Sequence, residues 1–489
     1  MPTDDDLPPD DLPRNFPQGS EDAEQARWLF DALDRKVRYD HTSDRWHVWN
    51  GHLWAPDKTR EVQRRVTELA YNSLIGVATS DRLGQRQRTA LEKVYRRLLD
   101  VGRTESALKS LSQLPEYKTD GSDWDQDPYL LGCANGIVDL RTNTLIENPG
   151  PETLVTRSTG HRFVPFEPEY DKFEAIQRHI PRMWKFLMEV TSEDADLAMF
   201  YLLWFGYSLF GTTAEQKFLI LTGLGRNGKG ALVSTMRYVF GDYSAEADAS
   251  LYMRSRFGAA RSDGARADLM ALKGKRLAVM SEPDGGAFNE EMLKAHTGGD
   301  PIVARGLFSN NVISWVPTHT ITFLTNEPPK VNDIGPSMAD RVLVADFRER
   351  FEGERQDKKL YDKLRTEAEG ILGVLCYAAR AWFHSETGLP IPDRIRDASR
   401  EYLESNDPLG RAINEAFSLD SAGQGSAAAL FEAYQDWFER VDAAGEPMTQ
   451  TAFGLALARK GFKKLKTKTG WVYRGIRPLN ALEAAGVVL

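Results

Sequence analysis

The chain has 489 residues, of which 41% are hydrophobic and 27% charged, a composition typical of a globular protein of about three domains. Its formal net charge of -9 excludes a uniformly basic coat for nucleic acid but leaves room for a local basic patch. The two cysteines, Cys133 and Cys376, lie far apart without CxxC spacing. That spacing argues against a zinc site and a disulfide framework, and it suits a reducing cytoplasm.

The first 160 residues are predicted to hold an acidic tail and one N-terminal unit. Residues 1–20 are rich in Asp and Pro and are expected to be disordered. Residues 21–160 are expected to form a mixed α+β domain. Helical periodicity runs from about 61 to 114, and residues 129–145 show a strand, turn, strand pattern.

A hairpin is predicted around the Asn50-Gly51 dipeptide, because an Asn-Gly turn between alternating apolar residues is a strong hairpin signal. Trp46, Trp49 and Trp54 flank this turn. Two roles are open to these side chains, stacking on nucleobases or packing into a small core. Packing is the favoured interpretation.

The longest apolar run, LAMFYLLWFGYSLFG, covers residues 197–211. A bilayer span takes about 20 apolar residues, so this run predicts a buried helix rather than a membrane segment. The N-terminus lacks the basic-then-apolar order of a signal peptide. These features predict a cytoplasmic protein with no membrane partner.

Residues 161–405 are predicted to form an α/β domain. Helical sequence over 161–215 is followed by short apolar runs that alternate with helices and turns, and 357–405 is helical again. Such runs suit a central, mostly parallel sheet. Strands are expected at residues 218–223, 276–282, 318–327 and 341–347.

The segment GLGRNGKGAL, residues 223–232, has the GxxxxGK spacing of a phosphate-binding loop. It directly follows the buried strand FLILTG and precedes helical sequence, which is the context that such a loop needs. The loop's N–H groups and the helix N-terminus would cradle phosphates, and Lys229 would add positive charge. The residues expected to bind the nucleotide are Gly223, Gly225, Asn227, Gly228, Lys229, Gly230 and Ala231.

Three further residues follow the loop in the order that ATP hydrolysis needs. Glu282 ends the second strand and would orient the attacking water or hold Mg²⁺ through water. Asn326 ends the third strand and would position that water against the γ-phosphate, and Arg341 would act as an arginine finger. Each residue type is common at strand ends, so only the ordered set with Lys229 predicts a catalytic site.

Residues 408–489 are predicted to form a C-terminal domain. The run ARKGFKKLKTKTGWVYRGIR, residues 458–477, carries many basic residues and no acidic one, with aromatic residues interleaved. Helix, turn and strand-like sequence of this kind predicts a winged helix that contacts DNA phosphates, with 449–460 as its recognition helix. A solvated charged hairpin is the alternative. The expected DNA contacts are Lys460, Lys463, Lys464, Lys466, Lys468 and Arg474.

Taken together, these segments resemble one family. The chain is similar to the superfamily 3 helicases, in particular the phage/plasmid primase-helicase branch related to poxvirus primase-helicases, over nearly everything after residue 25. The resembling segments are GLGRNGKG, RLAVMSEPD, LKAHTGGDPIVAR, TFLTNEPPKV and DRVLVADF, with CANGIVDLRTNTL upstream and the winged-helix-like tail downstream.

The resemblance implies an α/β, AAA+-like P-loop ATPase core between an N-terminal helicase-associated domain and a C-terminal winged-helix domain. It implies a homo-hexameric ring that uses ATP and Mg²⁺ to move 3′ to 5′ on single-stranded or forked DNA. Arg341 would then serve the ATP site of a neighbouring subunit. A hairpin at about 305–317 would project into the channel, with Arg305, Asn310 and Asn311 as candidate DNA contacts.

Three positions depart from the family's pattern. Gly230 stands where a Ser or Thr hydroxyl binds Mg²⁺, so we expect water to fill that coordination site and metal dependence to be weaker or altered. Ser281 precedes Glu282 where many members of the wider superfamily have a second acid. Asp340 replaces the first Arg of the family's pair, which leaves Arg341 as the finger candidate.

The leading prediction is an ATP-dependent DNA helicase for replication of a phage, plasmid or integrated mobile element. The sequence before residue 21 is too short for a primase domain, so no primer synthesis is expected, and a separate primase or initiator would be a partner. The alternative is an initiator or loader that binds ATP to assemble on DNA without unwinding it. Gly230 and Ser281 favour the alternative, and the complete catalytic set favours turnover.

Overall fold

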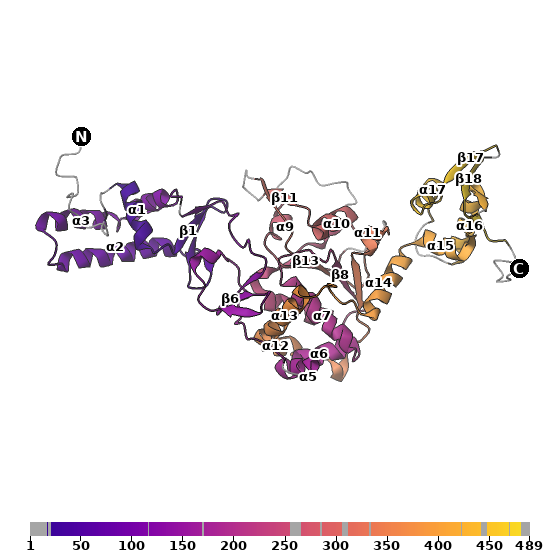
Figure 1. Ribbon diagram of the computed structural model, residues 1–489, viewed down its shortest axis with the longest axis horizontal. Helices are drawn as coiled ribbons and strands as arrows, with labels where there is room; N and C mark the ends of the chain where they lie inside the picture. Colours follow the sequence, from indigo (N-terminus) through magenta and orange to yellow (C-terminus); the bar gives the residue numbers. More distant parts are fainter. Residues whose placement is uncertain are drawn as a thin grey trace.

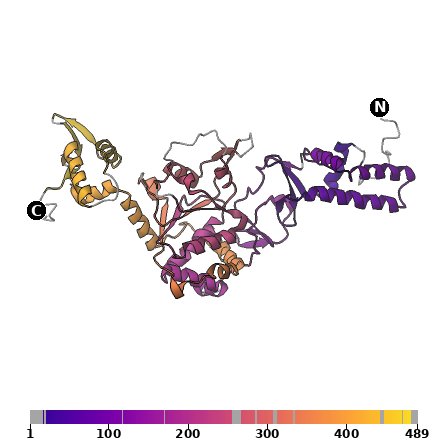
Figure 2. The same ribbon diagram turned by 180° about the vertical axis from the view of Figure 1, so that it is seen from behind.

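The computed structural model describes residue 17 and residues 21–115, 117–168, 171–254, 266–283, 286–305, 312–331, 334–421, 423–441, 447–468 and 470–480. The predicted tail (except residue 17), Asn310 and Asn311 lie outside the described residues. Figures 1 and 2 show an elongated arrangement, with a helical unit at the N-terminal end, a sheet in the middle and a smaller unit at the C-terminal end.

The N-terminal unit combines long helices with a four-stranded sheet of order β3-β2-β1-β4. The predicted Asn50-Gly51 hairpin is confirmed, because Trp49 pairs with Trp54 across it. Both rings are buried, 5.6 Å apart between centroids, so they pack into the core as favoured. The elements are α1 (Asp22–Ala32), β1 (Val37–Asp40), β2 (Arg45–Trp49), β3 (Trp54–Pro56), α2 (Glu61–Thr79), α3 (Gln85–Arg97), α4 (Val101–Leu111) and β4 (Lys118–Thr119).

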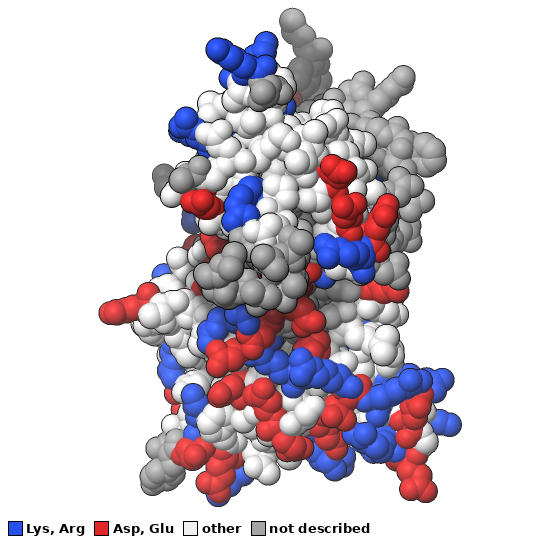
Figure 3. Space-filling model, turned by 90° about the vertical axis from the view of Figure 1, so that its right-hand side faces the viewer, with Lys and Arg blue, Asp and Glu red and all other residues white. Residues whose placement is uncertain are grey.

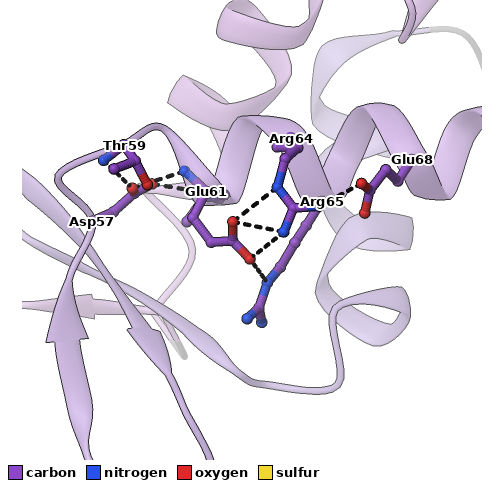
Figure 4. Close-up of polar contacts among 7 residues, drawn as sticks. Asp57, Thr59, Glu61, Arg64, Arg65 and Glu68 are labelled. Atoms are coloured by element: carbon purple, nitrogen blue, oxygen red, sulfur yellow. Dashed lines mark hydrogen bonds and ion pairs between the residues drawn. The ribbon is translucent and has the colours of Figure 1, made fainter.

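Helix α2 begins at a side-chain cap that Figure 4 shows in detail. One carboxylate oxygen of Asp57 accepts from the backbone N–H of Glu61 at 2.8 Å, and the other accepts from that of Val62 at 2.9 Å. These bonds satisfy N–H groups that a helix leaves without partners at its N-terminus. Hydrogen bonds from Arg64 lower the pKa of the Glu61 carboxyl. Because Asp57 directly follows β3, its bonds to the helix N–H groups tie the start of the helix to the end of the sheet.

The helical prediction for 161–215 is partly wrong, because the first helix of that stretch begins only at Lys172. Pro165 and Pro168 lie in the non-helical part, and proline removes a backbone donor and disfavours helix before it. The buried helix predicted at 197–211 is confirmed as α7. The elements here are β5 (Leu130–Cys133), β6 (Gly136–Asp139), β7 (Thr144–Ile146), η2 (Pro151–Thr153), α5 (Lys172–His179), α6 (Pro181–Thr191) and α7 (Ala195–Ser208).

The central sheet has five parallel strands in the order β14-β8-β13-β10-β9. All four predicted strands belong to it. Alternate side chains enter two separate cores; Leu219 and Leu221 face one, and Phe218 and Ile220 face the other. The strands are β8 (Phe218–Thr222), β9 (Ser244–Glu246), β10 (Leu277–Ser281), β13 (Thr320–Leu324) and β14 (Val342–Asp346).

Helices cover both faces of this sheet, as a near-continuous apolar strand requires. In Figure 1, α7 and α13 lie below the sheet, whereas α9, α10 and β11 lie above it. The elements are α8 (Lys229–Phe240), η3 (Gly241–Tyr243), η4 (Ala249–Tyr252), α9 (Ala267–Met270), α10 (Glu290–Gly298), β11 (Ile302–Arg305), β12 (Val312–Trp315), α11 (Pro336–Ala339), η5 (Gly353–Arg355), α12 (Leu360–Arg365) and α13 (Ala368–Phe383).

Helix α14 (Asp393–Ser405) leads from the sheet to the C-terminal unit. This unit has helices around a core that includes Tyr434, Phe453 and Tyr473, beside a three-stranded sheet of order β16-β18-β17. Across the described ranges, no helix is long and apolar enough to cross a membrane. The elements are α15 (Pro408–Ala416), β15 (Phe417–Ser418), β16 (Gln424–Ser426), α16 (Ala427–Arg440), α17 (Gln450–Arg459), β17 (Lys464–Thr467), β18 (Gly470–Arg474) and β19 (Arg477–Pro478).

A buried polar cluster beside the core that Phe218 and Ile220 face predicts that the folded state loses stability at acidic pH. The hydroxyl of Tyr252 lies 2.8 Å from Nδ1 of His296 and 3.3 Å from Nε2 of His319. Burial lowers the pKa of His296 to about 4 and that of His319 to about 3. Because the unfolded chain takes up these protons near pH 6.5, folded-state stability is full above that pH and falls as the pH drops toward the folded pKa values.

We expect His319→Phe to remove roughly 2 kcal/mol of the loss in stability between pH 7 and pH 5. The urea midpoint of the core transition, measured at both pH values by intrinsic fluorescence, checks this. The matched control is His41→Phe, in the N-terminal unit. An equal acid-side loss in the wild type and His319→Phe would contradict the prediction.

Candidate nucleotide site and basic hairpin

The strand order brings three of the predicted catalytic residues to one edge of the sheet. Strand β13 lies between β8 and β10, and all three are parallel. The carboxyl ends of parallel strands meet at the same edge, where ligands bind in open α/β sheets. Lys229, Asn326 and Glu282 follow these three strands, with the Asn in the middle.

These three side chains form a continuous polar chain. The ammonium of Lys229 donates to the Asn326 side-chain oxygen at 3.1 Å and to the carbonyl of Gly223 at 2.5 Å. The Asn326 amide nitrogen in turn lies 3.5 Å from a carboxylate oxygen of Glu282. The hydroxyl of Thr222 donates to the Asn326 carbonyl at 3.3 Å, which ties β13's end to the loop strand. The cluster thus places a cation, an amide and a carboxylate side by side.

The loop between β8 and α8 requires glycine at two positions. Gly223 has φ +140°, and a Cβ there would lie 2.4 Å from the carbonyl oxygen of Phe347. Gly228 has φ +93°, and a Cβ there would lie 2.6 Å from Cγ1 of Val190. Both values are closer than side-chain atoms tolerate, so larger residues would displace the loop. The two glycines of the GxxxxGK spacing therefore allow the loop backbone to pack closely against Phe347 and Val190.

The buried side chain of Asn227 stabilises the loop through hydrogen bonds to backbone groups. Its side chain is buried, its amide donates to the Phe347 carbonyl at 3.4 Å, and its oxygen accepts from the Lys229 N–H at 3.4 Å. Gly225 and Gly230 lie in the open, and Ala231 is part of the first turn of α8. Among the predicted nucleotide-binding residues, Asn227 is therefore placed to shape the loop rather than to face a ligand.

The local electrostatics favour an anion beside the loop. Burial lowers the pKa of Lys229, and the nearby Glu282 carboxylate opposes that shift. Lys229 begins α8, whose N-terminus adds partial positive charge. Glu282 holds a left-handed backbone conformation, with φ +47°, which is uncommon for a residue other than glycine. Backbone strain of this kind occurs at functional sites and is consistent with a positioned carboxylate.

Few groups are available to hold a metal. The described parts of the chain contain no cluster of three or more His, Cys, Asp or Glu side chains that could hold a metal ion. A carboxylate oxygen of Glu282 lies 3.5 Å from the Asn326 amide nitrogen, and a Cβ at Gly230 would meet no heavy atom within 4 Å. The space beside Gly230 is thus wide enough for water. These residues fit Mg²⁺ held by one carboxylate, waters and substrate phosphates, which is a common arrangement for this ion.

Arg341 lies at the amino-terminal ends of the parallel strands, whereas the cluster of Lys229, Asn326 and Glu282 lies at their carboxyl ends. Its carbonyl accepts from the Phe218 N–H at the amino end of β8, about 15 Å along the strand from the loop. Its guanidinium donates to the Ser337 carbonyl at 2.6 Å, to the Thr297 hydroxyl at 3.2 Å and to the Gln216 side-chain oxygen at 3.2 Å. Within one chain, Arg341 therefore does not join the other three residues.

A cavity of about 620 Å³ opens beside the loop. Phe186, Gly228, Phe351 and Leu360 contribute its apolar lining. The rest of the lining is mostly charged and includes both basic and acidic side chains, among them Arg226 and Arg355. Its position and size suit the nucleoside end of a nucleotide. Phe186, Phe351 and Leu360 were not among the predicted residues, because α6 and the segment after β14 are brought together only by the tertiary fold.

The predicted DNA contacts fall into two groups. Arg305 ends β11 and pairs with Val312 of β12, which supports a hairpin at the predicted 305–317 position. The lysines and arginine of the C-terminal run lie on or beside the antiparallel strands β17 and β18. Lys460 differs from the rest, because it forms an ion pair with Asp407 at 2.6 Å. Basic side chains stand at the upper end of the face in Figure 3, whereas acidic and basic ones are mixed below.

Comparison with known proteins finds one matching family and several viral relatives. Residues 26–191 match the family described as "D5 N terminal like". The chain is 22% identical over 427 residues to "Putative helicase L207/L206" of Acanthamoeba polyphaga mimivirus, across 81% of this chain and 43% of the relative. Over residues 26–191 the chain is therefore similar to a primase-helicase N-terminal family, and its relatives include viral proteins named as helicases.

Two further viral proteins are similar to this chain. "Putative helicase V13" of Sputnik virophage is 23% identical over 310 residues, which is 60% of this chain and 37% of the relative. "Putative primase C962R" of African swine fever virus (strain Badajoz 1971 Vero-adapted) is 30% identical over 191 residues, 37% of this chain and 18% of the relative. The chain thus spans less than half the length of each of these relatives.

Similar solved structures include "The A form apo structure of NrS-1 C terminal region-CTR", with a TM-score of 0.48 and 12% identity, covering 91% of this chain and 97% of that chain. "The apo structure of NrS-1 C terminal region (305-718)" has a TM-score of 0.48 and 11% identity, covering 92% and 98%.

Proposed function

We propose that this protein is an ATP-dependent DNA helicase that acts in replication of a phage, plasmid or integrated mobile element. The observation that carries the proposal is the hydrogen-bonded chain of Lys229, Asn326 and Glu282 at the carboxyl edge of a parallel sheet. Phosphoryl transfer to water needs a cation that binds the phosphates. It also needs polar groups, here an amide and a carboxylate, that position the attacking water. The viral relatives named as helicases support the same class of activity.

Each residue has a separate task in this proposal. Loop N–H groups and the Lys229 ammonium bind the β- and γ-phosphates of ATP and stabilise the charge that develops there. Asn326 and Glu282 orient the attacking water, and the Glu282 carboxylate accepts a hydrogen bond from it. Bound Mg²⁺ would neutralise phosphate charge, with Glu282 holding it through water.

The proposal extends to a ring in which neighbouring subunits complete each site. Arg341 lies on the edge of the sheet away from its own phosphate loop, so its guanidinium is better placed to serve another subunit. A repeated head-to-tail contact of this kind closes into a ring. We propose a homo-hexamer that moves 3′ to 5′ along single-stranded DNA, with the β11–β12 hairpin facing the strand.

The C-terminal unit is proposed to be a winged helix that binds DNA phosphates. Its elements follow the order helix, strand, strand, helix, helix, strand, strand from α15 through β18. The basic hairpin β17–β18 would be the wing, and α17 would be the recognition helix. Phosphate contacts from its lysines would give binding that weakens as salt concentration rises.

Steady-state ATP hydrolysis with Mg²⁺, measured with and without single-stranded DNA, tests the proposal together with displacement of a labelled strand from a fork. Turnover stimulated by DNA and strand displacement are the expected results. Binding of ATP without turnover in any DNA condition would instead favour an initiator or loader. Gly230 and Ser281, which leave few metal ligands, are the observation that keeps this second function in view.

We expect that a hydroxyl group introduced at position 230 raises the affinity of the site for Mg²⁺. Gly230→Ser should lower the Mg²⁺ concentration for half-maximal ATP hydrolysis several-fold, because the hydroxyl can replace a water ligand. The open space around Gly230 accommodates the side chain. Gly230→Ala is the matched control, since it adds the Cβ without the oxygen. Equal Mg²⁺ requirements for the Ser and Ala variants would contradict the prediction.

A further inference from the structure

The hairpin formed by β17 and β18 carries an exposed aromatic ring that does not belong to the hydrophobic core of the C-terminal unit. Trp471 is 49% exposed and lies outside the buried core of the C-terminal unit. Its strand neighbour Tyr473 is only 1% exposed and belongs to that core. An indole ring that keeps about half of its surface accessible has apolar area that a ligand could cover.

Two lysines flank this ring. Lys466 pairs directly with Trp471 across the hairpin, and Lys464 pairs with Tyr473, so all four side chains belong to one face. The Lys464 ammonium lies 5.1 Å from the centroid of the Trp471 ring, and that of Lys466 lies 5.9 Å from it. The exposed ring is therefore bracketed by positive charge at the spacing of cation–π contacts.

An aromatic ring between phosphate-binding cations is the arrangement that binds unpaired nucleotides. Proteins that bind single strands combine a basic track for the backbone with aromatic side chains on which bases stack. In a duplex the bases already stack on one another, and their faces are not accessible to a side chain. Phosphate contacts alone would not distinguish the two forms, whereas a stacking ring would.

We propose that Trp471 stacks on an unpaired base and that hairpin β17–β18 thereby prefers single-stranded DNA, or the unpaired part of a fork, over continuous duplex. This inference rests on the proposed DNA-binding function of the hairpin. Lys464 and Lys466 hold the flanking phosphates, while Trp471 takes the base between them. The opposite face of the hairpin, with Leu465 paired to Val472, takes no part.

The test compares variants of the full chain for binding to labelled oligothymidylate and to labelled duplex, by fluorescence anisotropy at several salt concentrations without ATP. Trp471→Ala should weaken oligothymidylate binding about tenfold or more, as loss of one stacked base does. The slope of log affinity against log salt should stay unchanged, because no phosphate contact is lost. Duplex binding should also stay unchanged, and Trp471→Phe should retain most of the affinity.

Two controls separate stacking from charge. Lys468→Ala should weaken binding to both DNA forms and should reduce the salt slope for single strands by about 0.7. Leu465→Ala, on the opposite face, should leave binding unchanged. A single 2-aminopurine in the oligonucleotide gives a direct signal, since its fluorescence is quenched on stacking and should recover in the complex with Trp471→Ala.

The outcomes are distinct. If Lys468→Ala changes affinity and slope while Trp471→Ala changes neither affinity nor 2-aminopurine fluorescence, the hairpin binds only phosphates and the stacking role is overturned. Equal losses for duplex and single strand with Trp471→Ala would overturn it as well. If neither variant affects either DNA, the proposed DNA-binding function of the hairpin fails with it. Because Trp471 lies outside the core, its variants should fold normally, which near-ultraviolet circular dichroism checks.

Discussion

Replacement of Lys229 by alanine should reduce DNA-stimulated ATP hydrolysis by at least a hundredfold, roughly the effect of removing one stabilising group from a transition state. The ammonium is the cation that reaches across the loop from Gly223 to Asn326, at the edge where the γ-phosphate would lie. Its partners are a backbone carbonyl and a side-chain amide, so its loss leaves no buried charge without a partner. The variant should therefore fold normally.

Release of inorganic phosphate, followed with and without single-stranded DNA, measures this effect. Lys36→Ala is the control, since Lys36 pairs with Asp34 far away in the N-terminal unit. Undiminished DNA-stimulated turnover in Lys229→Ala would show that the nucleotide site has been assigned to the wrong loop. If the wild type itself binds ATP without turnover, the initiator or loader function becomes the better account.

Arg341→Ala should abolish turnover, by about a thousandfold, while leaving ATP binding nearly intact. An arginine finger stabilises charge only in the transition state, so its removal lowers kcat without a matching loss of ground-state affinity. Because Arg341 lies at the far edge of its own sheet, this effect has to arise at a neighbouring subunit. Nucleotide affinity and turnover measured on the same preparation separate the two quantities.

Mixed assemblies provide the sharper form of this experiment. Lys229→Ala and Arg341→Ala chains, co-expressed with different tags and purified through both, should recover activity that each lacks alone. In a randomly mixed ring, about a quarter of the interfaces join an intact Lys229 to an intact Arg341. Absence of recovery, together with a lower melting temperature for Arg341→Ala, would make Arg341 a structural residue that ties Ser337, Thr297 and Gln216 together.

Local sequence patterns were sufficient to predict most strands and the spacing of the phosphate-binding loop. Five-residue apolar runs such as FLILT predict buried strands, because parallel strands are covered on both faces, and β8, β10, β13 and β14 lie where expected. The Asn50-Gly51 turn and the GxxxxGK spacing also carry their geometry in a few neighbouring residues. The helix expected from residue 161 was wrong in its first part, because Pro165 and Pro168 disfavour helix there.

Which of these strands and side chains lie next to one another depends on the tertiary packing. Strand order cannot be read from periodicity, yet it is the position of β13 between β8 and β10 that puts Asn326 within hydrogen-bonding distance of both Lys229 and Glu282. The same packing sends Arg341 to the other edge and encloses a cavity between α6 and the segment after β14. It also leaves Trp471 exposed while burying Tyr473 two residues away. Contacts between residues a hundred positions apart depend on how layers pack, and local sequence patterns do not encode that packing.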